Sequence, residues 1–152
     1  MSLFNRAEVV DKNFTSFVKS GDLPLGRTNL FLSQTNIRPS ELISIFETQV
    51  LSRHMDLKAR LLKELGKCFY TIGSSGHEGN AVFGNVFPYT DMAFLYYRNG
   101  PFFIERSKQV NGQTPIYDMA LSFMASSEDP ISGGRHKVLG SKPLNIPPQT
   151  ST

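Results

Sequence analysis

The stretch "PSELISIFETQVLSRHMDLKARLLKELG", residues 39–66, carries the strongest periodic pattern in this chain. Apolar residues recur along it at helical spacing, and they are Leu42, Phe46, Val50, Leu57, Leu61 and Leu65. This spacing predicts one long amphipathic helix that begins at Pro39 and ends where Gly66 takes the C′ position. The other face carries charges of both signs and is predicted to be solvated surface: Glu47, Arg53, Asp56, Lys58, Arg60 and Lys63.

Length and composition restrict the class of protein. The chain has 152 residues, which is enough for one domain with a hydrophobic core. Its 39% hydrophobic and 19% charged residues are typical of a soluble globular protein. The formal net charge of +3 favours weak attraction for anions and is too small for a nucleic-acid-binding surface.

Cysteine usage and apolar runs indicate the compartment. A lone cysteine, Cys68, excludes a disulfide framework and a multi-cysteine zinc site, and it is compatible with a reducing environment. No apolar run is long enough to span a membrane, and the first residues, "MSLFNRAEVVDKNF", lack the apolar core of a secretory signal. We therefore expect a cytoplasmic protein with no membrane partner.

Outside the long helix, the pattern alternates between helix and strand. Apolar residues at helical spacing predict a first helix over residues 5–19. The short apolar runs "CFYTI" (68–72) and "DMAFLYY" (91–97) predict strands, and "NAVFGNVF" (80–87) predicts a helix between them. A further helix is predicted in "TPIYDMALSFMAS" (114–126), where a proline stands near its start.

From Ser126 the chain loses periodicity and becomes rich in Gly, Pro and Ser. Such a composition contains few residues whose burial offsets the entropy of ordering the chain. A compact domain seldom ends in 27 residues of loop. We expect this tail either to be ordered by a ligand or partner, or to belong to a fold that the sequence does not complete.

The stretch "LYYRNGPFF", residues 95–103, places a guanidinium beside two phenols at the end of a predicted strand. Arginine grips a phosphate bidentately and a phenol adds a neutral donor. Since neighbours in a strand face opposite ways, Tyr97 and Arg98 need a bend to converge, and Asn99-Gly100 is suited to one. Locally, the simpler interpretation remains a core tyrosine and a surface arginine.

Two glycine-rich stretches are weaker anion-site candidates. "GSSGHEG", residues 73–79, lies between a predicted strand and a helix, but its glycine spacing differs from the dinucleotide-binding fingerprint. We interpret it as a strand-to-helix turn. "GGRHKVLGSK", residues 133–142, places two glycines before three basic residues and is either an anion-binding nest or an exposed basic loop.

Four pieces taken together resemble one family: "CFYTIGSSGHEGNAVFGNVF", "DMAFLYYRNGPFF", "GGRHKVLGSKPLN" and "QTST". Their order and approximate spacing are similar to the α-type N-terminal part of the thiamine-diphosphate-dependent E1 component of 2-oxo acid dehydrogenase complexes, particularly the branched-chain type. The likeness implies an α/β fold, with N-terminal helices and an incomplete parallel sheet. It divides the chain into an N-terminal helical extension (1–35) and a fragment of the thiamine-diphosphate-binding domain (36–152).

The resemblance also implies site residues. Tyr96, Tyr97, Arg98 and Ser151 would contact the cofactor, while Tyr70, Tyr97, His136 and Ser151 would face the substrate. The family's Gln-Met-Pro-x-His stretch is shortened after Arg135, so either His136 or Val138 matches its substrate histidine. The segment between Gly100 and Ser126 is longer than in most members, and Thr152 stands where most have proline.

The implied activity is oxidative decarboxylation of a 2-oxo acid, with 2-oxoisovalerate favoured over pyruvate, and acyl transfer to a lipoylated E2 partner. The family's magnesium ligands, and the β-type half or subunit that completes a dimer or heterotetramer, lie outside this sequence. The chain is therefore expected to be an N-terminal piece that is inactive alone, and no catalytic or metal residue is assigned within it. Two alternatives are a non-enzymatic interaction module that docks through the long helix and a small nucleotide-binding domain built on "GSSGHEG".

Overall fold

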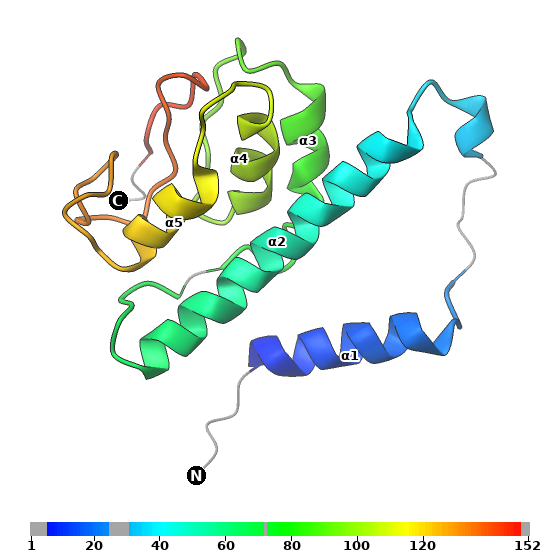
Figure 1. Cartoon of the computed structure of the whole chain (residues 1–152), viewed down its shortest axis with the longest axis horizontal. Coiled ribbons are helices and arrows are strands. Elements are labelled where there is room, and N and C mark those ends of the chain that lie inside the picture. Colours follow the sequence, from blue (N-terminus) through cyan, green and yellow to red (C-terminus); the bar gives the residue numbers. More distant parts are fainter. Residues whose placement is uncertain (1–5, 25–30, 72, 150–152) are drawn as a thin grey trace. The chain divides into compact units, whose positions relative to one another are not determined.

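The computed structural model describes residues 6–24, 31–71 and 73–149. Figure 1 shows the elements in chain order: α1 (Arg6–Ser20), a 3-10 turn η1 (Leu32–Gln34), α2 (Pro39–Glu64), α3 (Asn80–Val86), α4 (Gly100–Ser107) and α5 (Pro115–Phe123). The chain divides into two units, residues 1–42 and residues 43–152. None of the helices in the described ranges combines the length and the apolar character that crossing a lipid bilayer requires.

The first unit contains α1, η1 and the first residues of α2. Helix α1 confirms the helix predicted over residues 5–19. Its apolar side chains are largely exposed, and they are Val9, Val10, Phe14, Phe17 and Val18. At η1 the Phe31 N–H donates to the Gln34 side chain over 2.8 Å, which satisfies a donor at the helix start.

The ends of α2 agree with the sequence signals. At its start the Glu41 carboxylate accepts from the Arg38 N–H over 2.9 Å and pairs with the Arg38 guanidinium at 3.0 Å. At its end Gly66 has a φ of +69°, and Lys67 donates back to the Leu62 carbonyl over 2.8 Å. This six-to-one bond is the Schellman arrangement, so the predicted C′ role of Gly66 is confirmed.

The orientation of α2 differs from the prediction. Its buried residues are small or polar, namely Thr48, Ser52, Asp56 and Ala59, whereas much of the apolar stripe is exposed: Leu42, Phe46, Leu61 and Leu65. The prediction that Asp56 lies on a solvated face is therefore wrong. The physical reason is that buried polar side chains on this face find partners, such as the bond from Thr48 Oγ1 to Glu105, while their small size permits close approach.

Helix α4 lies at the centre of the second unit, and every one of its residues is buried. The residue pattern at 100–108 predicts no particular element. Helices α3 and α4 pack against each other, and Gly84 permits this because an added Cβ would lie 2.6 Å from the Phe102 carbonyl oxygen. The core joins α2, α4, α5 and three segments without regular structure, and its members are Ala59, Cys68, Leu95, Phe102, Phe103, Ile104, Met119, Phe123, Leu139, Leu144 and Ile146.

The two predicted strands are not strands in the described part of the chain. Residues 68–71 and 91–97 run as irregular chain, and no ladder of hydrogen bonds forms among the described residues. The Phe69 N–H donates to Phe123, at the end of a helix, and the Ala93 N–H donates to Asn145, in a loop. A strand needs a partner strand to satisfy its backbone, and neither segment has one here. The α/β class stays a prediction.

Residues 126–149 of the C-terminal tail supply core residues, which their composition does not predict. Figure 1 shows this segment, in orange and red, returning beside α4 and α5. Val138, Leu139, Leu144 and Ile146 are all buried. The Arg106 guanidinium of α4 donates to the Leu144 carbonyl over 3.3 Å. A few widely spaced apolar residues therefore attach this segment to the core, although its overall composition is typical of a loop.

A matched pair of leucine substitutions tests whether the core includes the C-terminal segment rather than the apolar stripe of α2. We expect Leu144→Ala to lower the free energy of unfolding by about 2–5 kcal/mol, because Leu144 is fully buried and its truncation leaves a cavity. Leu61→Ala, on the stripe that periodicity favours as core, should cost less than about 1 kcal/mol because Leu61 is 47% exposed. Denaturant unfolding measures both, and equal losses would contradict this assignment of the core.

Candidate anion-binding site

Three segments far apart in the sequence meet in the second unit. The Arg98 guanidinium donates to the Gly73 carbonyl over 2.9 Å. The Lys137 ammonium donates to the Tyr97 carbonyl over 3.1 Å, and the Tyr70 hydroxyl donates to the Arg135 carbonyl over 3.2 Å. Tyr70 with the Gly73–Ser74 turn, residues 96–99 and residues 133–138 therefore form one cluster, which we call the basic cluster.

A tight turn orients the tyrosine and arginine side chains. The Asn99 N–H donates to the Tyr96 carbonyl over 2.9 Å, so the bend expected near Asn99 is present. The Asn99 side chain accepts from Asn80 over 2.9 Å, which ties the turn to α3. As a result the Arg98 guanidinium carbon lies 5.4 Å from the centre of the Tyr97 ring, close enough for a cation–π contact.

The two phenols stand together. The Tyr96 and Tyr97 ring centres are 3.9 Å apart, and the Tyr96 hydroxyl donates to the Tyr97 hydroxyl. This hydrogen bond is the main reason that the pKa of Tyr97 is raised above its ordinary value. The Tyr97 hydroxyl is therefore protonated at neutral pH and remains a neutral group. Tyr96 is 45% exposed, whereas Tyr97 and Arg98 are half-buried.

A buried carboxylate from α2 supports the turn that carries Gly73. The Ser74 N–H donates to both Asp56 carboxylate oxygens, over 3.0 and 2.9 Å, and the Ser74 hydroxyl donates to one of them over 3.2 Å. The Ser52 hydroxyl shares a 2.6 Å hydrogen bond with Ser74. Burial raises the pKa of Asp56, and the hydrogen bonds from Ser74 oppose this rise.

Lys137 is a half-buried cation of the cluster. Its ammonium lies 4.6 Å from the centre of the Phe123 ring, in addition to its bond with Tyr97. Burial lowers the pKa of Lys137 to about 8; attraction to Asp56 opposes this change and repulsion from Arg98 adds to it. The ammonium therefore lies near one carboxylate and one guanidinium, in an environment that disfavours its charge.

The charges around Asp56 do not balance. Arg53 lies close enough to act on the Asp56 carboxylate, and it pairs loosely with Glu78 at 3.8 Å. The cations are then Arg53, Arg98 and Lys137, and the carboxylates are Asp56 and Glu78. With Arg135 of the 133–138 segment added, the cations outnumber these carboxylates, which makes the cluster a candidate site for an anion.

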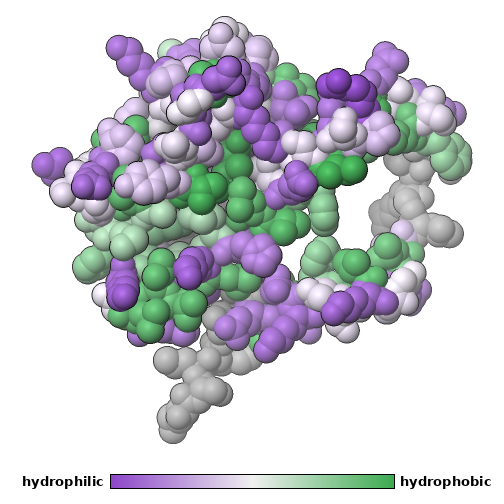
Figure 2. Space-filling view, viewed as in Figure 1, coloured by the Kyte–Doolittle hydropathy of each residue, from purple (hydrophilic) through white to green (hydrophobic). Residues whose placement is uncertain are grey.

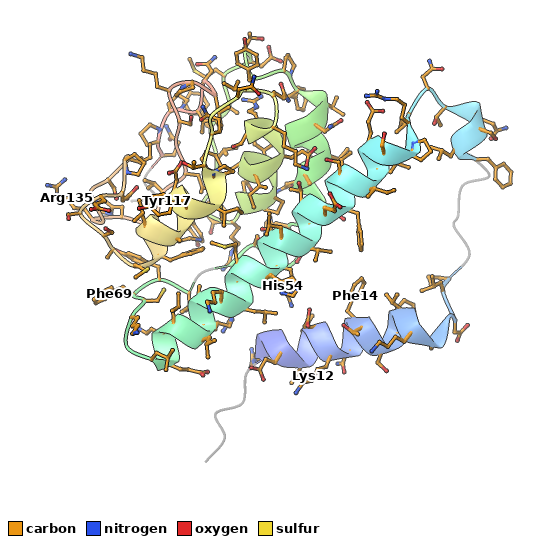
Figure 3. All side chains as sticks on the ribbon, viewed as in Figure 1. Lys12, Phe14, His54, Phe69, Tyr117 and Arg135 are labelled. Atoms are coloured by element: carbon orange, nitrogen blue, oxygen red, sulfur yellow. The ribbon has the colours of Figure 1, made fainter. Side chains whose placement is uncertain are left out.

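The positions of the expected site residues can now be compared. Tyr97, Arg98 and Tyr70 belong to the basic cluster, with Tyr96 at its exposed edge. His136 is exposed, and its backbone exchanges two hydrogen bonds with the Ser132 hydroxyl, over 3.1 and 2.8 Å. Ser151 lies outside the described residues. Figure 3 shows Arg135 at the outer edge of the same loop, and the sequence places it in the exposed class as well.

Lys137 and Asp56 are the two members that sequence reasoning missed. Lys137 lies inside the quoted "GGRHKVLGSK" stretch, where basic residues suggested anion binding without indicating which one is least exposed. Asp56 was missed because it lies among charged residues that the sequence analysis assigned to the solvated face of the helix. Within the described ranges, no group of three or more His, Cys, Asp or Glu side chains could hold a metal ion.

Comparison of the chain with protein-family models, with curated proteins and with solved structures gives no match.

A glycine pair tests the support of the cluster. A Cβ added at Gly73 would overlap the Asp56 carboxylate, whereas one added at Gly79 would meet nothing within 4 Å. We expect Gly73→Ala to lower the free energy of unfolding by about 1–3 kcal/mol, because the buried carboxylate must leave its Ser74 partners. Thermal unfolding of both variants measures this, and a loss at Gly79 equal to that at Gly73 would refute the steric explanation.

Lys137 should give stability a pH dependence. Its pKa of about 8 in the folded state lies below its ordinary value of 10.5. Below pH 8 both states carry the charge, and the folded state bears the whole cost of burying it. Between pH 8 and 10.5 the folded state loses the proton first, so the contribution of Lys137 to stability rises with pH.

Lys137→Met removes this dependence. We expect the variant's stability relative to the wild type to fall by roughly 2–3 kcal/mol between pH 7 and pH 10.5, because the wild type recovers over that range. The pKa values of Cys68 and Tyr97 are raised in the wild type, and removing the Lys137 ammonium raises that of Cys68 further, because the ammonium lowers it. Urea unfolding at several pH values provides the measurement. Parallel pH profiles for the two proteins would exclude a depressed pKa at Lys137.

Proposed function

We propose that this chain is the α-type N-terminal part of a thiamine-diphosphate-dependent E1 component of a 2-oxo acid dehydrogenase, with a branched-chain 2-oxo acid favoured over pyruvate. The observation that supports this proposal is the meeting of Tyr70, Tyr97, Arg98 and the loop at 133–138 in one basic cluster. These residues come from three of the four pieces on which the family resemblance depends, and nothing in the local patterns requires them to meet.

The donors of the cluster suit a diphosphate. A guanidinium and an ammonium supply positive charge with directed N–H groups, and phenol hydroxyls supply neutral donors. Bound thiamine diphosphate would supply the electron sink for decarboxylation, and the chain's own residues would bind and orient it. No group of three or more His, Cys, Asp or Glu side chains gathers among the described residues, and this proposal assigns magnesium no residue there.

The remaining roles follow from position in the cluster. Tyr70 is half-buried and packs against the core, so its ring would limit the space beside the bound acyl chain. Discrimination of this kind is worth about 1–3 kcal/mol per methylene group. His136 and Ser151 remain proposed substrate contacts, and Ser151 also a proposed cofactor contact. The proposed partners are a β-type E1 half or subunit and a lipoylated E2, and the proposed compartment is the cytoplasm.

Arg98→Ala tests the proposed function directly. A hydrogen bond to a charged group contributes about 1.5–3 kcal/mol, so we expect thiamine diphosphate to bind at least tenfold more weakly to the variant. Isothermal titration calorimetry of wild type and variant with thiamine diphosphate, in the presence of magnesium, measures the affinity. Unphosphorylated thiamine should bind poorly to both proteins, because the cluster is proposed to hold the diphosphate.

Arg38→Ala is the matched control, since Arg38 is exposed and pairs only locally with Glu41 among the described residues. It should leave the affinity for thiamine diphosphate unchanged. Equal affinities of the wild type for thiamine and thiamine diphosphate would rule out a diphosphate site. Circular dichroism of Arg98→Ala verifies that any loss of binding does not come from unfolding.

A second candidate function is a non-enzymatic interaction module. The exposed apolar stripe of α2 favours it, since Phe46, Leu61 and Leu65 are 54%, 47% and 60% exposed. Figure 2 shows hydrophobic side chains gathered on the surface over the C-terminal part of α2. Large exposed apolar patches often mark interaction surfaces. A chain that binds no thiamine diphosphate would support this second function over the first.

A further inference from the structure

Three parts of the second unit surround a cavity of about 430 Å³: α3, the segment 91–95 and α4. Helices α3 and α4 lie side by side (Figure 1). Pockets that hold small organic molecules commonly have volumes of about 300–1,000 Å³. The cavity has only Asn99 in common with the basic cluster, so a site here does not rest on the proposed function.

The walls of the cavity are held in place by Gln109, just after α4. Its side-chain amide donates to the carbonyls of Gly84 and Phe87, over 2.9 and 3.0 Å. Its amide oxygen accepts from the Tyr89 N–H over 2.9 Å. These bonds tie the end of α3 and the chain after it to α4, so the cavity is preformed, as ligand pockets usually are.

The lining of the cavity is mainly apolar. Four of its large apolar side chains are exposed, and they are Phe83, Phe87, Met92 and Phe94. The Phe83 and Phe87 rings stack with their centres 6.1 Å apart. Leu95 and Phe102, which also line the cavity, are buried. A cavity that leads from exposed rings to a buried apolar wall suits a ligand with an apolar, ring-containing body.

Arg106 of α4 lines the same cavity and is only 1% exposed. Its terminal nitrogens donate to three backbone carbonyls, over 3.0, 2.8 and 3.3 Å, and these belong to Pro88, Asp91 and Leu144. Its guanidinium carbon lies 4.7 Å from the centre of the Phe102 ring. The Nε atom has no hydrogen-bond partner among the described residues. A buried donor without an acceptor is costly.

The charge of Arg106 also lacks a counter-ion in the part of the chain that the structure describes. None of the ion pairs there includes Arg106. Burial lowers the pKa of Arg106, and attraction to Asp91, which does not pair with it, opposes this change. The carbonyls satisfy N–H groups but leave the unit charge in place, and a buried cation without an anion is unfavourable.

The chemistry of the cavity favours a carboxylate over a phosphate. One guanidinium supplies one positive charge, which a monoanion neutralises and a phosphate dianion exceeds. Asp91 is the one acidic residue in the lining, and its charge would repel a dianion more strongly than a monoanion. The side-chain amides of Asn80 and Asn99 are the other polar groups of the lining.

We propose that this cavity binds a small organic monocarboxylate with an apolar, ring-containing body, and that the carboxylate pairs with the Arg106 guanidinium. The carboxylate supplies both an acceptor for Nε and the missing negative charge. The exposed rings of Phe83, Phe87 and Phe94 then cover the apolar body and lose contact with water.

Nuclear magnetic resonance titration of the 152-residue chain at pH 7 compares three probes: phenylacetate, its uncharged amide phenylacetamide, and acetate. Only phenylacetate combines the ring with the charge, so we expect it to bind at least tenfold more tightly than either of the others. It should also raise the melting temperature, because it binds the folded state alone. Equal affinities for phenylacetate and phenylacetamide, or no binding of phenylacetate, would overturn the proposal.

A phenylalanine pair locates the ligand without disturbing the core. Phe94 lines the cavity and Phe69 does not, and the two are similarly exposed, at 61% and 66%. We expect Phe94→Ala to bind phenylacetate at least threefold more weakly than the wild type, because it loses a ring contact. Phe69→Ala should bind as the wild type does. Equal weakening in the two variants would show that the ligand lies elsewhere.

Asp91→Asn tests the pairing with Arg106 and avoids removing a buried side chain. The variant keeps the backbone carbonyl to which Arg106 donates and removes the carboxylate that competes with the ligand. We expect it to bind phenylacetate about twofold to fivefold more tightly, with unchanged affinity for phenylacetamide. Unchanged affinity for phenylacetate would contradict the pairing. Phenylacetate binding tests this cavity alone, whereas thiamine diphosphate binding tests the proposed function alone.

Discussion

The second unit depends on the hydrogen bonds that the buried Asp56 carboxylate accepts from Ser74. They turn the polar face of α2 inward and fix the Gly73–Ser74 turn against it. A carboxylate is stable inside a protein only if such donors replace water. Glycine is required at position 73 because any side chain would overlap the carboxylate. The carbonyl of that glycine accepts a hydrogen bond from Arg98, so one buried acid fixes the turn to which Arg98 is bonded.

In this region the second unit holds charged side chains inward and leaves apolar side chains exposed. Burial disfavours the charged forms of both Asp56 and Lys137, although the two attract each other. The unit retains these charged groups while it exposes leucines whose burial would stabilise it. This arrangement has a physical reason if the inward polar face of α2 serves binding and its outward apolar face serves association. The proposed enzyme uses the polar face, and the alternative interaction module uses the apolar face.

Local signals predicted local structure well and long-range pairing poorly. The ends of α2 were predictable, because a proline and a glycine restrict the backbone at the residue itself. Which face of α2 is buried was not, since Thr48 and Asp56 are buried only because Glu105 and Ser74 lie opposite them. Likewise Arg98 could be proposed from its neighbours and a family resemblance, whereas the contact of the Lys137 ammonium with the Phe123 ring joins residues of two different segments.

The placement of Leu144 and Ile146 in the core has a consequence for how the protein forms on the ribosome. Synthesis delivers α2, α3, α4 and α5 first, yet the apolar side chains of α4 are fully covered only after residues 138–146 have emerged. Contacts between segments so distant in sequence also form slowly. A growing chain therefore exposes part of its apolar core until residues 138–146 have been synthesised, and chaperones can bind that exposed surface during this period.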